Sequence, residues 1–410
     1  MPERKQKVLL VSSQPIQNAA SLRLMAAHPD FEVLTAYCSL PDAKLWRDDE
    51  HLNKEAFDTP ALDGYKWERM ANWSPLPQLG RFYGLINPGV VRRVFASDCV
   101  IVYGHSYVTF WLAITTVKLA GKSLILTTDA THLEPSDPSG WKTKIKKRLL
   151  PFLYNHVADV VLVPSSASRR FVCSLGVSEQ RVALTPYVVD NEYIESVAAH
   201  TDWKRVRAEW EIPGDARVVV FCAKFIARKR PQDALRAFAR ALVPDSYLIM
   251  IGDGPLVDSL KAEATQLGIA DRVRFTGLIK YSRLPELYAA SDILVFTSER
   301  EPYGLPVNEA MICGLPVIAS DRVGAAQDLI REGETGFVYP CGDLDQLASL
   351  IREVFSDDQR LRRIGQAARH RMQSWSPREN AEATLNSVKR AISGERSPFK
   401  SPDSLVEKAL

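Results

Sequence analysis

Short apolar runs that alternate with helix-like segments constrain the fold of this chain more than any other feature. Within residues 291–328 the order is strand, acidic loop, helix and strand. The two runs, 292–296 and 316–319, are rich in β-forming residues, and the helix between them ends near Gly314. Such alternation is typical of parallel sheets with helices on both faces.

The first half of the chain alternates in the same way. We expect strands at 7–12, 32–36, 100–103, 123–127, 159–163 and 182–185, and helices at 19–27, 107–119, 142–157 and 167–175. Residues 41–90 carry scattered tryptophans and prolines without a clear period. At 410 residues the chain is long enough for two α/β domains. The expected fold class is therefore α/β, with two Rossmann-like, doubly wound parallel-sheet domains.

The boundary between the two domains is expected within 186–200. The first domain then spans 1–195 and the second spans 196–375. The last segment, 396–410, is rich in Ser, Pro and Lys, and we expect a mobile tail there.

Composition narrows the class of protein. Apolar residues make up 46% and charged residues 25% of the chain, which is ordinary for a soluble globular protein. A net charge of +3 is too small to indicate nucleic acid as a partner. The six cysteines show no metal or disulfide spacing, which suits a reducing cytosol. No apolar segment reaches about 18 residues, so neither a transmembrane helix nor a signal peptide is expected. We therefore expect a cytoplasmic location.

Two glutamates flank the start of the helix within 291–328. Glu301 lies before this helix and Glu309 lies in its early turns, with Gly304 between them. Glycine lets the backbone approach a ligand closely, and amides that open a helix form an anion site. Because carboxylates accept hydrogen bonds from sugar hydroxyls, the pattern fits a sugar joined to a diphosphate. The structural alternative is that glutamates near helix starts suit the helix dipole, by roughly 0.3–1 kcal/mol.

A basic turn follows the apolar strand at 218–222 and precedes the helix that begins near Pro231. Its four cations are Lys224, Arg228, Lys229 and Arg230. Because the start of a helix is already partly positive, four cations there are unfavourable without an anion, and a diphosphate would relieve this. The alternative is a solvated basic loop.

Together the two blocks resemble retaining glycosyltransferases of the large GT-B-type family that includes sucrose synthases and bacterial mannosyl- and glucosyltransferases. The donor-site motifs of that family are G-R-L-x-x-x-K and E-[PG]-[FY]-G-x-x-x-x-E. This chain has A-K-F-I-A-R-K at 223–229 and E-P-Y-G-L-P-V-N-E at 301–309. The resemblance covers about residues 215–350. The chain departs from the family pattern at Ala223 and Lys224, where Gly and Arg are usual, and at Asp328, where Glu is usual.

The resemblance implies an arrangement and an activity. The two domains would face each other across a cleft, with the sugar donor in the second domain and the acceptor in the first. A helix at 376–395 would cross back onto the first domain. The implied reaction moves a sugar, with retention of anomeric configuration, from a nucleotide-diphosphate sugar to a hydroxyl of a glycan or lipid-linked acceptor in polysaccharide or glycoconjugate biosynthesis.

The resemblance also implies roles for individual residues. Glu309 would hold the ribose hydroxyls and Glu301 the far hydroxyls of the sugar. Independently of the resemblance, Lys224, Lys229 and the amides near Gly304 and Leu305 are suited to stabilise the departing diphosphate. The expected donor-binding set is Lys224, Lys229, Gly252, Gly254, Leu278, Glu301, Tyr303, Gly304, Leu305 and Glu309.

No metal and no further cofactor is expected. Metal-dependent sugar transferases generally use Asp-x-Asp, and this chain has Asp343-Leu344-Asp345. That tripeptide falls at an expected helix start, where Asp343 is a natural cap.

Candidate catalytic residues of the first domain follow its strands. His105 comes after the strand at 100–103, and Asp129 comes after the strand at 123–127, with His132 close behind. Many relatives carry an important histidine after this second strand, and Asp129 is the nearest match. A carboxylate there would stabilise positive charge at the sugar carbon or orient the acceptor. The expected catalytic set is Asp129, His105, Lys229 and Glu301, whereas a satisfied loop histidine is the alternative for His105.

The stretch at 141–153 is basic and then apolar, and it begins with Trp141. A basic amphipathic helix of this kind can lie on an anionic membrane surface, which would place the protein peripherally on the inner face of a membrane. A solvated face on a buried helix is the alternative. For the whole chain, two other functions stay open: a nucleotide-sugar epimerase or hydrolase on the same fold, and a non-catalytic partner subunit of a glycosyltransferase complex.

Overall fold

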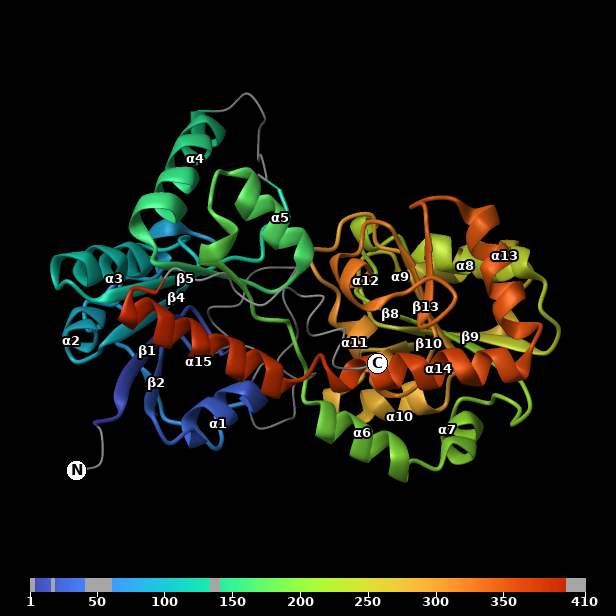
Figure 1. Ribbon diagram of the computed structural model, residues 1–410. Coiled ribbons are helices and arrows are strands. Elements are labelled where there is room, and N and C mark those ends of the chain that lie inside the picture. The colour runs from blue at the N-terminus through green and yellow to red at the C-terminus, as the bar shows by residue number, and fades with distance from the viewer. Residues whose placement is uncertain (1–3, 16–18, 41–60, 133–140, 396–410) are drawn as a thin grey trace.

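Two parallel sheets organise the molecule (Figure 1). The computed structural model describes residues 4–15, 19–40, 61–132 and 141–395. The first sheet has the order β3-β2-β1-β4-β5-β6-β7 and the second the order β10-β9-β8-β11-β12-β13. The strand pairs within both sheets are parallel. This confirms the expected fold class of two Rossmann-like, parallel-sheet domains.

The strands of the first sheet are β1 (Gln6–Ser12), β2 (Phe31–Tyr37), β3 (Trp67–Arg69), β4 (Cys99–Tyr103), β5 (Ser123–Thr127), β6 (Val160–Val163) and β7 (Val182–Leu184). Those of the second are β8 (Arg217–Cys222), β9 (Ser246–Ile251), β10 (Val273–Gly277), β11 (Ile293–Phe296), β12 (Val317–Ser320) and β13 (Gly336–Tyr339). Central strands such as β11 are buried along their whole length, as expected for strands covered on both faces.

The helices of the first domain are α1 (Ala19–Ala27), α2 (Val90–Phe95), α3 (Val108–Leu119), α4 (Trp141–Phe152) and α5 (Ser166–Ser174). Those that follow are α6 (Asn191–His200), α7 (Trp203–Glu209), α8 (Pro231–Ala241), α9 (Val257–Gln266), α10 (Leu284–Ala289), α11 (Leu305–Ile312), α12 (Gly324–Leu329), α13 (Leu344–Phe355), α14 (Asp358–Gln373) and α15 (Pro377–Ser393). Within the described ranges, none of these helices combines the length and the apolar character needed to cross a bilayer.

Helix α15 joins the end of the chain to the first sheet. It follows α14 of the second domain and packs against α1 and against β4, β5, β6 and β7 (Figure 1). Ala381, Leu385 and Val388 share a buried cluster with Val8 and Leu10 of β1. The apolar face of α15 therefore completes the core of a domain that is distant in sequence.

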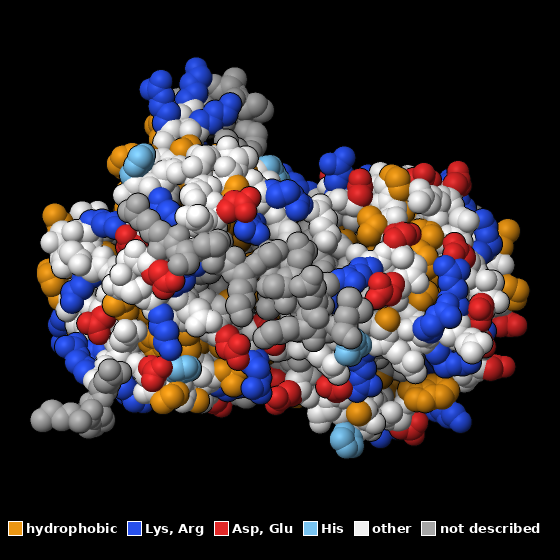
Figure 2. Space-filling view, in the orientation of Figure 1, with side chains coloured by type: hydrophobic (Ala, Val, Ile, Leu, Met, Phe, Trp, Pro, Cys, Tyr) orange, Lys and Arg blue, Asp and Glu red, His pale blue; other side chains and the backbone are white. Residues whose placement is uncertain are grey.

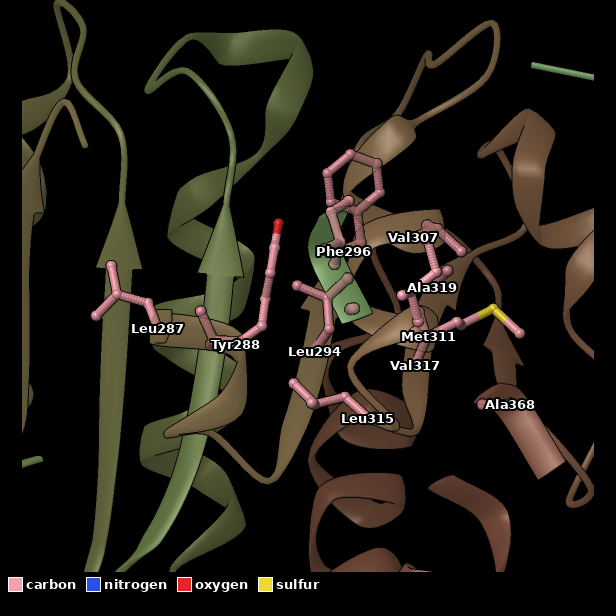
Figure 3. Close-up of a cluster of buried hydrophobic side chains, with 14 of the residues drawn as sticks. Leu287, Tyr288, Leu294, Phe296, Val307, Met311, Leu315, Val317, Ala319 and Ala368 are labelled. Carbon is pink, nitrogen blue, oxygen red and sulfur yellow. The ribbon is translucent and has the colours of Figure 1, made fainter. Parts of the chain in front are cut away.

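Part of the core of the second domain lies next to the two motif blocks. Leu294 and Phe296 of β11 gather with Val317 of β12 and with Val307 and Met311 of α11 (Figure 3). These side chains are fully buried. The start of α11 is thus fixed by packing on two neighbouring strands.

The linker between the domains, residues 185–190, is held by hydrogen bonds to its backbone carbonyls. The Tyr187 carbonyl accepts from Tyr303 Oη at 2.9 Å, from Asn308 Nδ2 at 3.0 Å and from Trp375 Nε1 at 3.1 Å. The Pro186 carbonyl accepts from Asn380 Nδ2 at 2.8 Å. The chain therefore crosses between the domains at a fixed point.

A second contact joins the domains away from the linker. The Ser166 N–H, at the start of α5, donates to both carboxylate oxygens of Asp328 in α12, at 3.0 and 3.3 Å. Beside it, the Arg170 guanidinium donates to the Gln327 side chain. Asp328, which departs from the family pattern, thus binds the first domain.

Candidate active site

The two motif blocks meet at the carboxyl ends of neighbouring strands. β8 and β11 pair in parallel, so the turn after β8 and the loop after β11 leave the same edge of the sheet. There Lys229 Nζ donates directly to Glu301 Oε2, and Arg228 Nη1 lies 4.0 Å from the same oxygen. The side chains of Lys229 and Glu301 are each 13% exposed. The structure therefore brings two of the predicted site residues into contact.

Burial and charge act in opposite directions on Lys229. Burial lowers its pKa, and the Glu301 carboxylate opposes that shift. The ammonium also lies 5.5 Å from the centre of the Phe296 ring. An anion bound here would favour the charged lysine in the same way as Glu301 does.

Carboxylates of the chain already pair with cations of the basic turn. This corrects the expectation from the sequence that the turn needs a bound anion. Arg230 pairs with Asp233 at 2.6 Å and with Glu299 at 3.3 Å, while Lys229 pairs with Glu301. Carboxylates of the chain itself therefore compensate much of the positive charge. A diphosphate would have to compete with Glu301 for Lys229 rather than fill an empty positive site.

Gly304 allows the loop to turn into α11. Its φ is +107°, a conformation that L side chains rarely adopt. A Cβ there would lie 3.0 Å from the Phe296 ring and 3.2 Å from both Glu301 Cγ and Val323 Cγ1. Glycine therefore lets the N-terminus of α11, which begins at Leu305, lie beside Glu301.

Glu309 lies in the second turn of α11 and is only 5% exposed. Its Oε2 accepts a hydrogen bond from Tyr288 Oη at 3.0 Å, and the Tyr281 hydroxyl is also hydrogen-bonded to this carboxyl. Burial raises the pKa of Glu309 to about 7, and the two tyrosine hydrogen bonds oppose the shift. A buried carboxyl whose pKa is this strongly perturbed is a candidate functional group.

Three residues of the expected donor set have structural roles in this fold. A Cβ at Gly252 would lie 2.0 Å from the Ala223 carbonyl oxygen, and one at Gly254 would lie 2.6 Å from the Phe225 carbonyl oxygen. These glycines therefore let two loops pack together, behind the turn that holds Lys224. The Tyr303 side chain is buried and bonded to the linker, so only its backbone is left to face a ligand. The donor-binding role expected for Tyr303 stays a prediction, and its backbone would have to supply it.

The remaining donor-set residues lie at the same edge of the second sheet. Lys224 is half-buried in the turn after β8, and Leu305 is half-buried at the first position of α11. Leu278 follows β10 and is 44% exposed.

Asp129 lies at the junction of the two domains. Its Oδ2 accepts from Tyr187 Oη at 3.5 Å, and its backbone carbonyl accepts from Ser168 Oγ at 3.0 Å. The Tyr187 ring in turn meets the Tyr303 ring edge to face, with centres 5.2 Å apart. Contacts therefore lead from Asp129 through the linker to the loop that carries Gly304.

His105 has different surroundings. It follows β4, and its carbonyl accepts from Trp111 Nε1 at 2.9 Å. Burial and the nearby Lys146 ammonium lower the pKa of its imidazole. These contacts lie within the first domain and link His105 to α4.

Reasoning from the sequence missed the tyrosines around Glu309 and the contact between Asp328 and Ser166. Tyr288 lies on α10 as one more apolar position of a buried helix, so only the packing of α10 on α11 brings its hydroxyl to Glu309. No sequence spacing signals that contact.

The Asp-x-Asp tripeptide has the capping role that the sequence favoured. The Asp343 side chain accepts from the Gln346 N–H at 2.9 Å at the start of α13, and Asp345 pairs with Arg240 at 2.9 Å. Among the residues that the structure describes, no group of three or more His, Cys, Asp or Glu side chains is arranged to hold a metal ion.

A pocket of about 530 Å³ lies at the interface between the domains, outside the Lys229–Glu301 cluster. Its lining comes from the segment after β5, from α5 and from α12, and includes His132, Arg170, Phe171 and Gln327.

Part of the chain is similar to a known family. Residues 202–371 match the family model described as "Glycosyl transferases group 1". A curated relative, the N-acetyl-alpha-D-glucosaminyl L-malate synthase of Bacillus anthracis, is 34% identical over 43% of this chain and 45% of its own length. A phosphatidylinositol monomannoside mannosyltransferase of Mycolicibacterium smegmatis is 32% identical over 52% of this chain and 57% of its own length. The matched stretches thus span about half of these relatives.

Solved structures share the whole fold. The HepE protein of Anabaena, crystallised with UDP, superposes with a TM-score of 0.72 at 20% identity, over 94% of this chain and 100% of HepE. The sucrose-phosphate synthase of Thermosynechococcus elongatus superposes with a TM-score of 0.68 at 21% identity, over 95% of this chain and 100% of the synthase. The GT-B arrangement of two facing domains is thereby confirmed.

Proposed function

Because residues 202–371 match the model of the group 1 glycosyl transferases, we propose that the chain belongs to that family and moves a sugar from a nucleotide-diphosphate sugar to a hydroxyl of a glycan or lipid-linked acceptor. The observation that carries the proposal is the contact between Lys229 and Glu301 at the opening of α11, with the buried Glu309 one turn further along. In this cluster cations and carboxylates lie side by side, as an anionic sugar donor requires.

The diphosphate binds where Lys229, Arg228 and the first amides of α11 converge. On arrival it takes over Lys229 from Glu301, because both carry negative charge and compete for one ammonium. Glu301 is then free to accept hydrogen bonds from sugar hydroxyls. Losing one preorganised donor to a developing negative charge typically costs about 10²–10³ in rate.

The chemistry exchanges one bond at the sugar carbon. The bond from that carbon to the diphosphate oxygen breaks, and a bond to the acceptor oxygen forms on the same face, so the anomeric configuration is retained. The acceptor proton passes to the departing phosphate. Asp129, at the domain junction, stabilises positive charge on the sugar carbon, and His105 orients the acceptor from the end of β4. In this proposal the cations of the second domain replace a metal.

The acceptor is proposed to be a glycan or a lipid-linked molecule. One relative supports a lipid acceptor by name, since it is a phosphatidylinositol monomannoside mannosyltransferase. We propose a cytoplasmic location, with peripheral contact to the inner face of a membrane.

Helix α4 supplies the membrane contact. Lys144, Lys146, Lys147 and Arg148 are exposed, and basic side chains gather on the outer part of α4 (Figure 2). Sedimentation with vesicles that contain anionic lipid, at low and high salt, tests this. Charge reversal at Lys144, Lys146 and Lys147 should abolish binding at low salt, whereas unchanged binding would contradict the membrane contact.

A thermal-shift screen across UDP-, GDP- and ADP-sugars tests the donor site. One donor should stabilise the wild type, and Lys229→Ala and Glu309→Ala should lose that effect. Arg240→Ala is the matched control, because Arg240 is an exposed cation of the same domain that pairs with Asp345. Absence of stabilisation by every donor would contradict the proposal. Release of free sugar without any acceptor would indicate a hydrolase instead.

A further inference from the structure

The Glu309 carboxyl is held by neutral donors. Tyr288 is fully buried on α10, and its hydroxyl donates to Glu309 Oε2 at 3.0 Å. Tyr281, in the short turn before α10, supplies the second tyrosine hydrogen bond. Figure 3 shows the Tyr288 ring beside Leu294, with its hydroxyl at the end that points away from Leu315. Among the described residues, no ion pair to Glu309 is formed.

The two hydroxyls leave the carboxylate with spare capacity. An ionised carboxylate offers about four lone-pair sites, and the tyrosines use two of them. About two remain, which is the number that the two hydroxyls of a ribose need. A lysine or arginine in the place of Tyr288 would occupy the carboxylate more strongly and would leave it less able to exchange partners.

We propose that Tyr288, assisted by Tyr281, is a positioning residue that keeps the Glu309 carboxyl oriented so that it can accept both ribose hydroxyls of the donor nucleotide. The inference rests on the proposed function, because it assigns Glu309 to the nucleotide. It adds two points. Nucleotide affinity depends on whether the Glu309 carboxyl is protonated, and Tyr288 determines the pH at which affinity changes.

The surroundings of Glu309 support a proton-dependent site. The groups that face it are the thiols of Cys222 on β8 and Cys313 after α11, together with the two tyrosines. Beyond them, Asp190 and Tyr193 face Tyr281, and Arg369 of α14 faces Cys313. Burial raises the pKa of both thiols and of both tyrosines, so these four groups stay neutral around neutral pH. Glu309, whose pKa is raised to about 7, is the group that changes charge there.

The sign of the effect follows from these contacts. Ribose hydroxyls need a carboxylate that accepts, so the protonated form of Glu309 competes with nucleotide binding. Affinity should rise as pH rises toward about 7 and level off above it. Removing the Tyr288 hydroxyl takes away a hydrogen bond that lowers the pKa of Glu309. The pH above which nucleotide affinity stays constant should therefore rise.

The test is calorimetric titration of the full chain with UDP and with GDP at a series of pH values. Tyr288→Phe should weaken binding about tenfold at pH 7 and should regain most of the loss about one to two pH units higher. Glu309→Gln should bind weakly with little dependence on pH. Tyr339→Phe is the matched control, because Tyr339 is fully buried in the same domain and its hydroxyl has no hydrogen-bond partner among the described residues. It should leave the pH profile unchanged.

An infrared titration of the ligand-free protein separates this inference from the proposed function. The stretching band of the protonated carboxyl that disappears in Glu309→Gln should titrate at higher pH in Tyr288→Phe than in the wild type. If the nucleotide binds but Tyr288→Phe weakens it equally at all pH values, or the band does not move, the inference is overturned and the proposed function stands. If the band moves but no nucleotide binds the wild type, the proposed function is overturned, and the positioning role with it.

Discussion

The two domains present their candidate chemistry differently. In the second domain, Lys229, Glu301 and Glu309 are nearly buried, and neighbouring strands and helices hold them through direct contacts. In the first domain, Asp129 is exposed, and its carboxylate accepts a hydrogen bond from the Tyr187 hydroxyl at 3.5 Å. A buried charge is normally paired or belongs to a functional site. Burial therefore marks the candidate groups of the second domain even without a ligand. In the first domain burial gives no such mark, so the role proposed for Asp129 needs a bound acceptor to be seen.

The largest expected effect separates the domains most clearly. Replacing Lys229 with Ala removes the cation that faces the departing diphosphate and leaves Glu301 with the more distant Arg228. We expect kcat/KM for sugar transfer to fall by about 10²–10³, as for loss of one preorganised donor. Arg240→Ala should stay within about twofold of the wild type, since its side chain is half exposed. A Lys229→Ala protein with wild-type turnover would mean that the second domain does not stabilise the leaving group.

The buried Glu309 carboxylate of the proposed donor site should also lower the free energy of unfolding. Glu309 has a pKa of about 7 in the folded protein against 4.5 ordinarily, so the folded state binds more protons between these values. Its contribution to stability is therefore lost as pH rises through that window. Glu309→Gln should be more stable than the wild type by roughly 1–3 kcal/mol above pH 7. Near pH 4.5 the two proteins should unfold alike.

Denaturant unfolding at the two ends of this window measures the difference. A Glu309→Gln protein that is less stable than the wild type above pH 7 would show that the carboxylate is a structural anchor rather than a functional group held at a cost.

A smaller effect is expected in the first domain. Asp129→Ala should lower turnover about tenfold to a hundredfold, less than the change at Lys229, because water screens an exposed charge. Affinity for the donor nucleotide should not change. Asp63→Ala, another exposed aspartate of the same domain, is the control and should leave turnover unaltered. If Asp129→Ala weakened nucleotide binding as strongly as Lys229→Ala, the division of roles between the domains would be wrong.

The smallest effect concerns the contact between the domains. Asp328→Asn keeps an acceptor for the Ser166 N–H but removes the charge, so it should destabilise the protein by about 1 kcal/mol. Gln327→Ala removes the exposed neighbouring contact with Arg170 and should cost less than half of that. Thermal unfolding of the two variants measures both values. Equal losses would show that the Asp328 carboxylate is not the main link between α12 and α5.

The contrast between the domains also explains what the sequence alone predicts. Apolar runs in buried parallel strands are easy to recognise, and the strand expected at 123–127 is β5 residue for residue. β3 and α2 fall in or beside 41–90, which has no clear period, and β3 is a three-residue edge strand that depends on pairing with β2. Residues 41–60, 133–140 and the expected mobile tail at 396–410 lie outside the described residues.

Within the site, local motifs were informative and long-range contacts were not. The spacing of Glu301 and Glu309 around Gly304 is set by one loop and one helix, so it is visible in the sequence. The hydrogen bond from the Tyr303 hydroxyl to the linker was not predicted, because it joins residues 116 positions apart in the chain. Tyr288 was missed for the same reason, since only the packing of α10 against α11 brings it to Glu309.

A crystal structure of the protein with its nucleotide-sugar donor tests the central claim most directly. We predict that Lys229 leaves Glu301 and bonds the diphosphate at the start of α11, while the Glu309 carboxylate accepts from the ribose hydroxyls and keeps its bond to Tyr288. A donor seated instead in the pocket between α5 and α12, with the Lys229–Glu301 pair intact, would contradict the account.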